Sequence, residues 1–289
     1  MVGLPTLTSV RISMKFAIKT MVAAAALVAV GVAQATVATL TVGGSITTGG
    51  YSINSLSGEG TLTFSSALIG ALNAAKLQVT AVAPATTPVI FKTNAATQVI
   101  SISSVSATAP VTSLTGDFTG MGVTVTGVAT AGGTLQTAAT SNIATNGGSL
   151  QITNLNVDLI AKRVYADLVG GNGVGAKANV YLWDIAQVTG STSIDLSKWP
   201  LTGYAQSTVN NTLSGLTINA AAFDLFATSL GLTANGITSL KTVTDYGVIN
   251  STITVSSVPE PETLALMGLG LAGISLTTRR RRAACHPVV

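Results

Sequence analysis

The sequence contains very few of the side chains that carry most enzyme and metal chemistry. Its 289 residues include one histidine and one cysteine, and charged residues make up only 8% of the chain. These two residues are His286 and Cys285, next to the C-terminus. The rest of the chain therefore has no disulfide, no His–Cys zinc site and no Ser-His-Asp or Cys-His catalytic group. We predict that it holds no metal or cofactor and that it is not an enzyme.

Positive charge is also scarce, except at the two ends of the chain. The formal net charge is +4, but Arg11, Lys15 and Lys19 lie near the N-terminus and four consecutive arginines occupy 279–282. Between residues 36 and 257, seven basic and eight acidic side chains leave a charge of −1. A phosphate-binding surface needs clustered cations. We therefore predict no nucleic-acid partner.

The N-terminal region has the three parts of a secretory signal peptide. Basic residues precede an apolar run at 21–32, and Ala33 and Ala35 form a small-x-small cleavage site. We predict that signal peptidase cuts after Ala35, which removes residues 1–35. Met14 is the expected start, because the residues before it add nothing to the signal. The alternative is an N-terminal membrane anchor that is retained.

The C-terminal region, 258–289, also has three parts. Pro259, Glu260 and Pro261 come first, and the two prolines are expected to keep this segment out of both helix and sheet. An uncharged apolar stretch follows, which as a helix would be about 24 Å long. Because the hydrocarbon core of a bilayer is roughly 30 Å thick, bilayer thinning or snorkelling of the arginines has to complete a membrane span.

The expected membrane anchor and its cytoplasmic stop follow from this pattern. The anchor residues are Leu264, Leu266, Leu269, Leu271, Ile274 and Leu276. The positive-inside rule then places Arg279, Arg280, Arg281 and Arg282 on the cytoplasmic side of the membrane. The alternative is a buried core helix followed by a solvated basic end.

This three-part tail closely resembles the PEP-CTERM sorting signal of exported proteins of Gram-negative bacteria. The resemblance covers residues 258–282 and says little about the rest of the chain. It implies that an exosortase, a membrane-embedded enzyme with a cysteine nucleophile, recognises Pro259, Glu260 and Pro261 and removes the span. The expected route is Sec export, an intermediate transiently tethered to the inner membrane, and delivery to the cell surface or the extracellular space.

The body between the two signals, 36–257, alternates small polar and branched apolar residues in many places. This pattern predicts an all-β, antiparallel, β-sandwich-like body with two short helices, flanked by the signal-peptide helix and the transmembrane sorting helix. Ser65 or Ser66 is expected to cap a helix at 67–76, and Asn219 a helix at 220–230. The expected strands are 37–42, 60–64, 77–82, 89–92, 98–105, 123–128, 150–160, 162–169, 178–185, 212–219 and 248–255.

Three local patterns refine this prediction. The apolar parity changes between Ile152 and Leu155, which indicates a β-bulge. The glycine-rich segment 170–175 lies between two strands, so we interpret it as a hairpin turn rather than as a phosphate-binding loop or a calcium repeat. The segment 130–148 is expected to be a long loop or a boundary between two candidate halves, 36–129 and 149–257.

Two groups of residues are candidates for function. Tyr165, Tyr181, Trp183, Trp199 and Tyr204 are either a glycan-binding patch or the large residues of the core, and the core interpretation is favoured. The second group would make the body a carboxylate-based hydrolase if its members shared a cleft. This group consists of Asp158, Asp167, Asp184 and Asp195.

The leading hypothesis is a non-enzymatic structural or interaction protein of the extracellular or biofilm matrix, with exopolysaccharide as its candidate partner. The alternative is a surface domain that binds a small ligand, either haem or a sugar. The hairpin around 170–175 and the helix after Leu216 loosely resemble HtaA-type haem-binding domains. Such domains use His and Tyr near the iron, and the body has no histidine.

Overall fold

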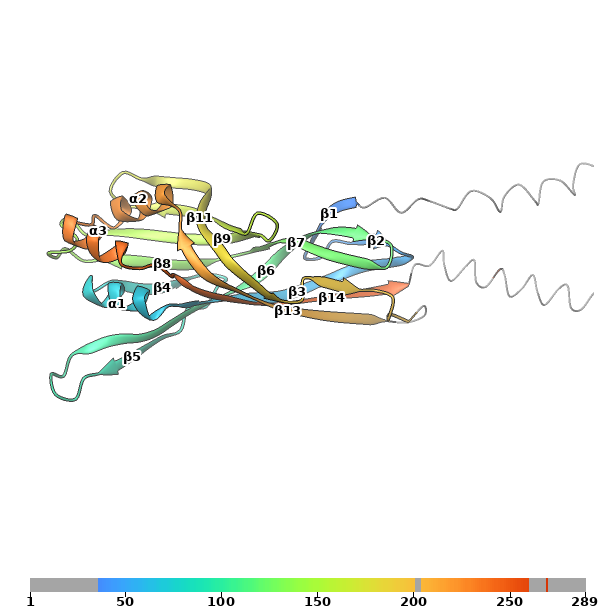
Figure 1. The fold of residues 1–289 in the computed structure, drawn as a ribbon, viewed down its shortest axis with the longest axis horizontal. Coiled ribbons are helices and arrows are strands. Elements are labelled where there is room, and N and C mark those ends of the chain that lie inside the picture. The colour runs from blue at the N-terminus through green and yellow to red at the C-terminus, as the bar shows by residue number, and fades with distance from the viewer. Residues whose placement is uncertain (1–35, 201–203, 260–268, 270–289) are drawn as a thin grey trace, which may run out of the picture. The chain divides into compact units, whose positions relative to one another are not determined.

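The computed structural model describes residues 36–200, 204–259 and 269, and most of this region is antiparallel β-sheet (Figure 1). The helices are α1 (Ser66–Ala74), α2 (Ala220–Ser229) and α3 (Ala234–Lys241). The strands are β1 (Thr36–Thr41), β2 (Ile46–Thr48), β3 (Tyr51–Phe64), β4 (Gln78–Val82), β5 (Val89–Thr93), β6 (Ile100–Thr119), β7 (Gly122–Thr130), β8 (Gly133–Ala138), β9 (Gly148–Asp158), β10 (Arg163–Gly170), β11 (Gly175–Gly190), β12 (Ser193–Asp195), β13 (Ala205–Ile218) and β14 (Gly247–Pro259).

All of these strands belong to one connected sheet. Its main path is β12-β7-β6-β3-β14-β13-β11-β10-β9-β8-β4, and β7 also pairs with β9. Off this path, β1 and β5 pair with β6, and β2 pairs with β3. The path from β7 through β14 to β9 is therefore a closed circuit of hydrogen-bonded strands. The predicted all-β antiparallel character is confirmed. The predicted sandwich is not, because the sheet closes on itself through the β7–β9 pairing instead of forming two separate sheets packed face to face. Long strands such as β6 and β11 accumulate enough twist to bring β7 and β9 together.

The inward-facing side chains form two apolar clusters along this sheet. The helix-end core lies where α1, α2 and α3 pack against the strands (Figure 1), and the distal core lies toward the other end of the same strands. The strand β3 contributes to both, with Ile53 in the distal core and Leu62 in the helix-end core. The helix-end core also includes Phe64, Leu72, Leu150, Trp183 and Tyr246, and the distal core includes Leu40, Tyr51, Leu114 and Trp199.

Both predicted helices are present, with the predicted caps. The Ser65 hydroxyl accepts a hydrogen bond from the Leu68 amide at 3.0 Å, and the Asn219 side chain accepts one from the Ala221 amide at 3.0 Å. Each helix directly follows one of the two strands, β3 and β13, that flank β14. The third helix, α3, was not predicted. Its Gly236 lowers helix propensity, yet this glycine is needed because a Cβ there would lie 2.5 Å from the Ile143 carbonyl oxygen.

Each predicted strand is present in whole or in part, and several extend much further than expected. The predicted bulge is also confirmed, because Tyr165 pairs with Asn156 while Asp167 pairs with Thr153, and Asn154 has a φ of 55°. The short strands β2 and β12 were missed. So was β8, which lies within the segment expected to be a loop. Strands from both candidate halves share the sheet, and the division into halves stays a prediction.

Candidate functional site

The predicted sorting signal begins where the sheet ends. The last residue of β14 is Pro259, which pairs with Tyr51 of β3, so the expectation that Pro259 would lie outside the sheet was wrong. Proline is tolerated at this position because it terminates the strand, where a missing backbone donor interrupts no further ladder. At its other end β14 pairs with Phe64, next to α1, so the sorting signal leaves the body at the end of β14 remote from the helices.

Most of the other predicted signal residues lie outside the described residues. They are Ala33, Ala35, Glu260, Pro261, Leu264, Leu266, Leu271, Ile274, Leu276, Arg279, Arg280, Arg281 and Arg282. Leu269 is described, and its side chain is 70% exposed. Within the part of the chain that the structure describes, no helix has both the length and the apolar character needed to cross a bilayer.

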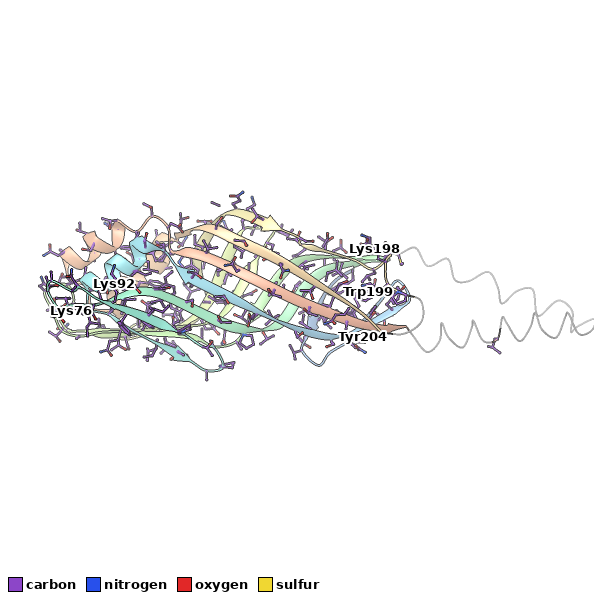
Figure 2. All side chains as sticks on the ribbon, turned by 90° about the horizontal axis from the view of Figure 1, so that it is seen from below. Lys76, Lys92, Lys198, Trp199 and Tyr204 are labelled. Atoms are coloured by element: carbon purple, nitrogen blue, oxygen red, sulfur yellow. The ribbon has the colours of Figure 1, made fainter. Side chains whose placement is uncertain are left out.

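The five aromatic residues separate into buried and exposed groups. Trp183 and Trp199 are buried in the two cores, so the core interpretation is confirmed for both. Trp199 donates from Nε1 to the Ser207 hydroxyl at 2.8 Å and lies at the distal end of the sheet, near Tyr204, which is 64% exposed (Figure 2). The remaining two, Tyr165 and Tyr181, are half-buried.

Tyr165 and Tyr181 form a pair on the outer surface of the sheet. Their neighbours Val164 and Ala166 point into the helix-end core, so the alternate residue Tyr165 faces outward. A register shift in the pairing of β10 with β11 places Tyr181 directly opposite Tyr165. The two ring centroids are 5.5 Å apart, with an angle of 37° between the ring planes.

Charged side chains hold this pair in place. The guanidinium carbon of Arg163 lies 4.7 Å from the centroid of the Tyr181 ring, and the Tyr181 hydroxyl donates a hydrogen bond to Asp184. Partial burial and this hydrogen bond raise the pKa of Tyr181, so the phenol remains a neutral donor. In the ladder, Arg163 pairs with Asp158 on one side and Asp184 on the other. We call Asp158, Arg163, Tyr165, Tyr181 and Asp184 the outer tyrosine patch.

Asp167 lies two residues after Tyr165 on β10, and its carboxylate links two β-bulges, one in each neighbouring strand. Its carboxylate accepts hydrogen bonds from the Asn154 side chain at 3.0 Å and from the Asn179 amide at 2.9 Å. Both asparagines have positive φ, 55° for Asn154 and 51° for Asn179, and each lies where the strand beside β10 has an extra residue. Asparagine tolerates this backbone conformation better than most residues. Asp167 therefore has a structural role.

We expect Asp167→Ala to destabilise the protein by about 1–3 kcal/mol, because two hydrogen bonds to a carboxylate are lost at a bulged position. Urea denaturation of the variant and the wild type would measure the difference. Asp224→Ala is the matched control, since Asp224 is exposed on α2 and should change stability by no more than about 0.5 kcal/mol. Equal stability of the two variants would contradict the structural role of Asp167.

The four carboxylates proposed for a hydrolase are not brought into one cleft. Asp158, Asp167 and Asp184 lie on three adjacent strands, whereas Asp195 lies on β12, which pairs with β7. Asp158 accepts hydrogen bonds from the amides of Ile160 and Ala161 in the turn after β9. Hydrogen bonds from Ser197 lower the pKa of Asp195. Each carboxylate thus stabilises its own local structure.

The glycine-rich segment 170–175 is the turn of the β10–β11 hairpin, as predicted, and Gly170 pairs with Gly175. The Asn172 side chain donates to the carbonyl oxygens of Gly147 and Ser229, which ties the turn to the C-terminal end of α2. Among the described residues, no three His, Cys, Asp or Glu side chains are grouped so that they could hold a metal ion.

The comparison with protein families identifies the tail. A model of the PEP-CTERM protein-sorting motif matches residues 257–282. The chain contains a PEP-CTERM sorting domain. The motif implies processing by an exosortase and sorting to the cell envelope or surface. No curated protein and no solved structure matched this PEP-CTERM protein.

Sequence reasoning identified the residues of the PEP-CTERM motif but only part of the outer tyrosine patch. Tyr165, Tyr181, Asp158 and Asp184 were singled out, in two separate groups. Arg163 was missed as a member of the site, although it is the residue that joins the groups. Its signal in the sequence is its position, two residues before Tyr165 on the same face of a strand.

Proposed function

We propose that this PEP-CTERM protein is a non-enzymatic surface protein that binds neutral polysaccharide of the extracellular matrix through its outer tyrosine patch. Export by the Sec route and a transient inner-membrane-tethered intermediate would precede this role. The observation that carries the proposal is the pair of half-buried tyrosine rings, Tyr165 and Tyr181, bordered by hydrogen-bonding side chains on the outer face of β9, β10 and β11.

The chemistry of the patch suits a sugar ring. An aromatic ring offers an apolar face to the C–H groups of a sugar, while carboxylate, guanidinium and phenol groups accept from or donate to its hydroxyls. Arg163 and Asp184 already restrain Tyr181, so little side-chain entropy is lost on binding. Tyrosine and arginine are also enriched at protein–protein interfaces, where a ring and a planar cation offer the same kinds of contact.

The charges of the patch favour an uncharged polymer. Asp158 and Asp184 lie on either side of Arg163, so carboxylates outnumber cations in the patch. An acidic polysaccharide would meet repulsion from these two groups, while a neutral one would meet only hydrogen-bonding partners. The body as a whole carries a charge of −1 between residues 36 and 257, which adds no attraction for a polyanion.

The test is the binding of the mature protein to the exopolysaccharide of the producing cells and to neutral and acidic reference glycans. We expect a variant carrying both Tyr165→Ala and Tyr181→Ala to bind the neutral polymer about tenfold more weakly, because the stacking surface is lost. Affinity electrophoresis in gels containing each glycan would measure the change in affinity.

Tyr204→Ala is the matched control, because Tyr204 is an exposed tyrosine outside the patch. This variant should bind as the wild type does. Absence of binding by the wild type, preference for the acidic glycan, or an equal loss in the Tyr204 variant would each contradict the proposal.

A further inference from the structure

A cavity of about 70 Å³ lies within the helix-end core and is lined by residues of the strands and of the three helices. Leu62 and Phe64 of β3 contribute to its wall, as do Leu72 of α1, Phe226 of α2 and Leu240 of α3. The space exceeds the roughly 10–15 Å³ that a single water molecule requires. It is therefore large enough to consider an organic occupant.

The cavity results from small residues at inward-facing positions of the strands. Gly60 of β3 and Ala107 and Ala109 of β6 all line it. Protein interiors are normally packed with few voids larger than a water molecule, and a larger side chain at these positions would fill the space. The sequence therefore keeps open a volume that branched aliphatic residues occupy elsewhere in the same sheet.

The residues that line the cavity are uncharged, and most of them are apolar. An ionised ligand group would lose its hydration there without an opposite charge to compensate, which is strongly unfavourable. A wholly apolar occupant would meet a different difficulty, because two of the polar groups in the wall have no hydrogen-bond partner among the described residues.

Trp183 and Tyr246 supply these polar groups. Both residues line the cavity, both are at most 3% exposed, and their ring centroids are 6.2 Å apart. Neither the Trp183 Nε1–H nor the Tyr246 hydroxyl has a hydrogen-bond partner among the described residues. Burial raises the pKa of Tyr246, so its phenol keeps its proton and remains a donor. Because buried polar groups are nearly always paired, two unpaired donors beside one cavity point to an acceptor that occupies it.

We propose that this cavity binds a small, uncharged, mostly aliphatic molecule with a single oxygen acceptor, of the class of medium-chain alcohols, ketones and esters. The oxygen accepts hydrogen bonds from both the Trp183 Nε1–H and the Tyr246 hydroxyl, and the hydrocarbon part lies against Leu62, Leu72 and Phe226. This site is independent of the outer tyrosine patch, because Trp183 belongs to the inner face of β11 and Tyr181 to its outer face.

The test compares 1-octanol with octanoate, using the mature protein and isothermal titration calorimetry at about pH 8, where octanoate is ionised. We expect saturable binding of octanol and binding of octanoate that is weaker by about tenfold or more, because the carboxylate must be desolvated. Absence of saturable heat with octanol, which would mean that the cavity holds only water, overturns the proposal. So does equal affinity for octanoate.

Three variants locate the binding site. Tyr246→Phe keeps the ring but removes a donor, and should weaken octanol binding roughly three- to tenfold. Ala109→Leu fills the cavity and should abolish binding. Phe91→Ser is the control for adsorption to the surface, since Phe91 is 60% exposed on β5, and it should bind octanol as the wild type does. Circular dichroism would establish that each variant is folded. Unchanged binding by folded Tyr246→Phe protein, or loss of binding in the Phe91 variant, overturns the assignment to this cavity.

Discussion

Replacing Pro259, Glu260 and Pro261 together by alanine is expected to block processing of the protein at its C-terminal end. The PEP-CTERM motif matches this segment, and the exosortase implied by the motif requires a recognisable substrate sequence. We expect the variant to stay in the membrane fraction with the arginine cluster intact, whereas the wild-type protein is recovered without it. Mass spectrometry of both proteins, isolated from producing cells, would measure the two ends of each chain.

The control for this experiment is Glu262→Ala, which also removes one carboxylate but leaves the Pro-Glu-Pro sequence intact. This variant should be processed as the wild type is. Release of the triple-alanine variant, or retention of the Glu262 variant to the same extent, would contradict recognition through the motif. The same measurement tests the predicted N-terminal end, since cleavage after Ala35 makes Thr36 the first residue.

The structure adds a constraint on where the exosortase cuts. Because β14 extends to Pro259 and lies between β3 and β13 in the sheet, cleavage well before Pro259 would remove residues from an inner strand. Cleavage at or after Pro259 leaves every strand pairing of the body intact. We therefore expect the mature protein to retain the whole of β14.

Much of the local structure could be predicted from the sequence because its causes are local. The caps at Ser65 and Asn219 depend on residues within one helical turn, and the bulge beside Asp167 follows from a change in apolar parity along a single strand. By contrast, β8 was missed because its buried face is formed by Thr134 and Gln136 together with Ala138. A polar buried face gives no hydrophobic alternation to detect.

The closure of the sheet and the outer tyrosine patch depend on relations between strands. The pairing of β7 with β9 passes over the intervening strand β8, and strand periodicity carries no information about which strands are neighbours. Tyr165 and Tyr181 meet only because the ladder shifts between Val164 and Tyr165. The alternation along a single strand could identify these tyrosines as candidate surface residues, but it could not show that they form a pair. It also could not predict the cavity beside Trp183.

The second large effect is expected at Gly133, where β8 pairs with β9 next to the bulge. A Cβ at this position would lie 2.0 Å from the Ile152 carbonyl oxygen and 3.0 Å from the Thr153 Cα atom. Both are backbone atoms of the strand that β8 pairs with, so the clash cannot be relieved by rotating a side chain. Gly133→Ala must therefore separate β8 from β9 and weaken the packing of these two strands in the helix-end core.

We expect Gly133→Ala to lower the free energy of unfolding by about 3 kcal/mol or more, which is at the upper end of the cost of overpacking. Gly70→Ala is the matched control, because nothing lies within 4 Å of a Cβ at this exposed position on α1. That change should raise stability by about 0.5–1 kcal/mol, since alanine favours the helix more than glycine does. Urea denaturation monitored by tryptophan fluorescence would measure both, and a Gly133 variant as stable as the wild type would mean that β8 does not pair with β9 as described.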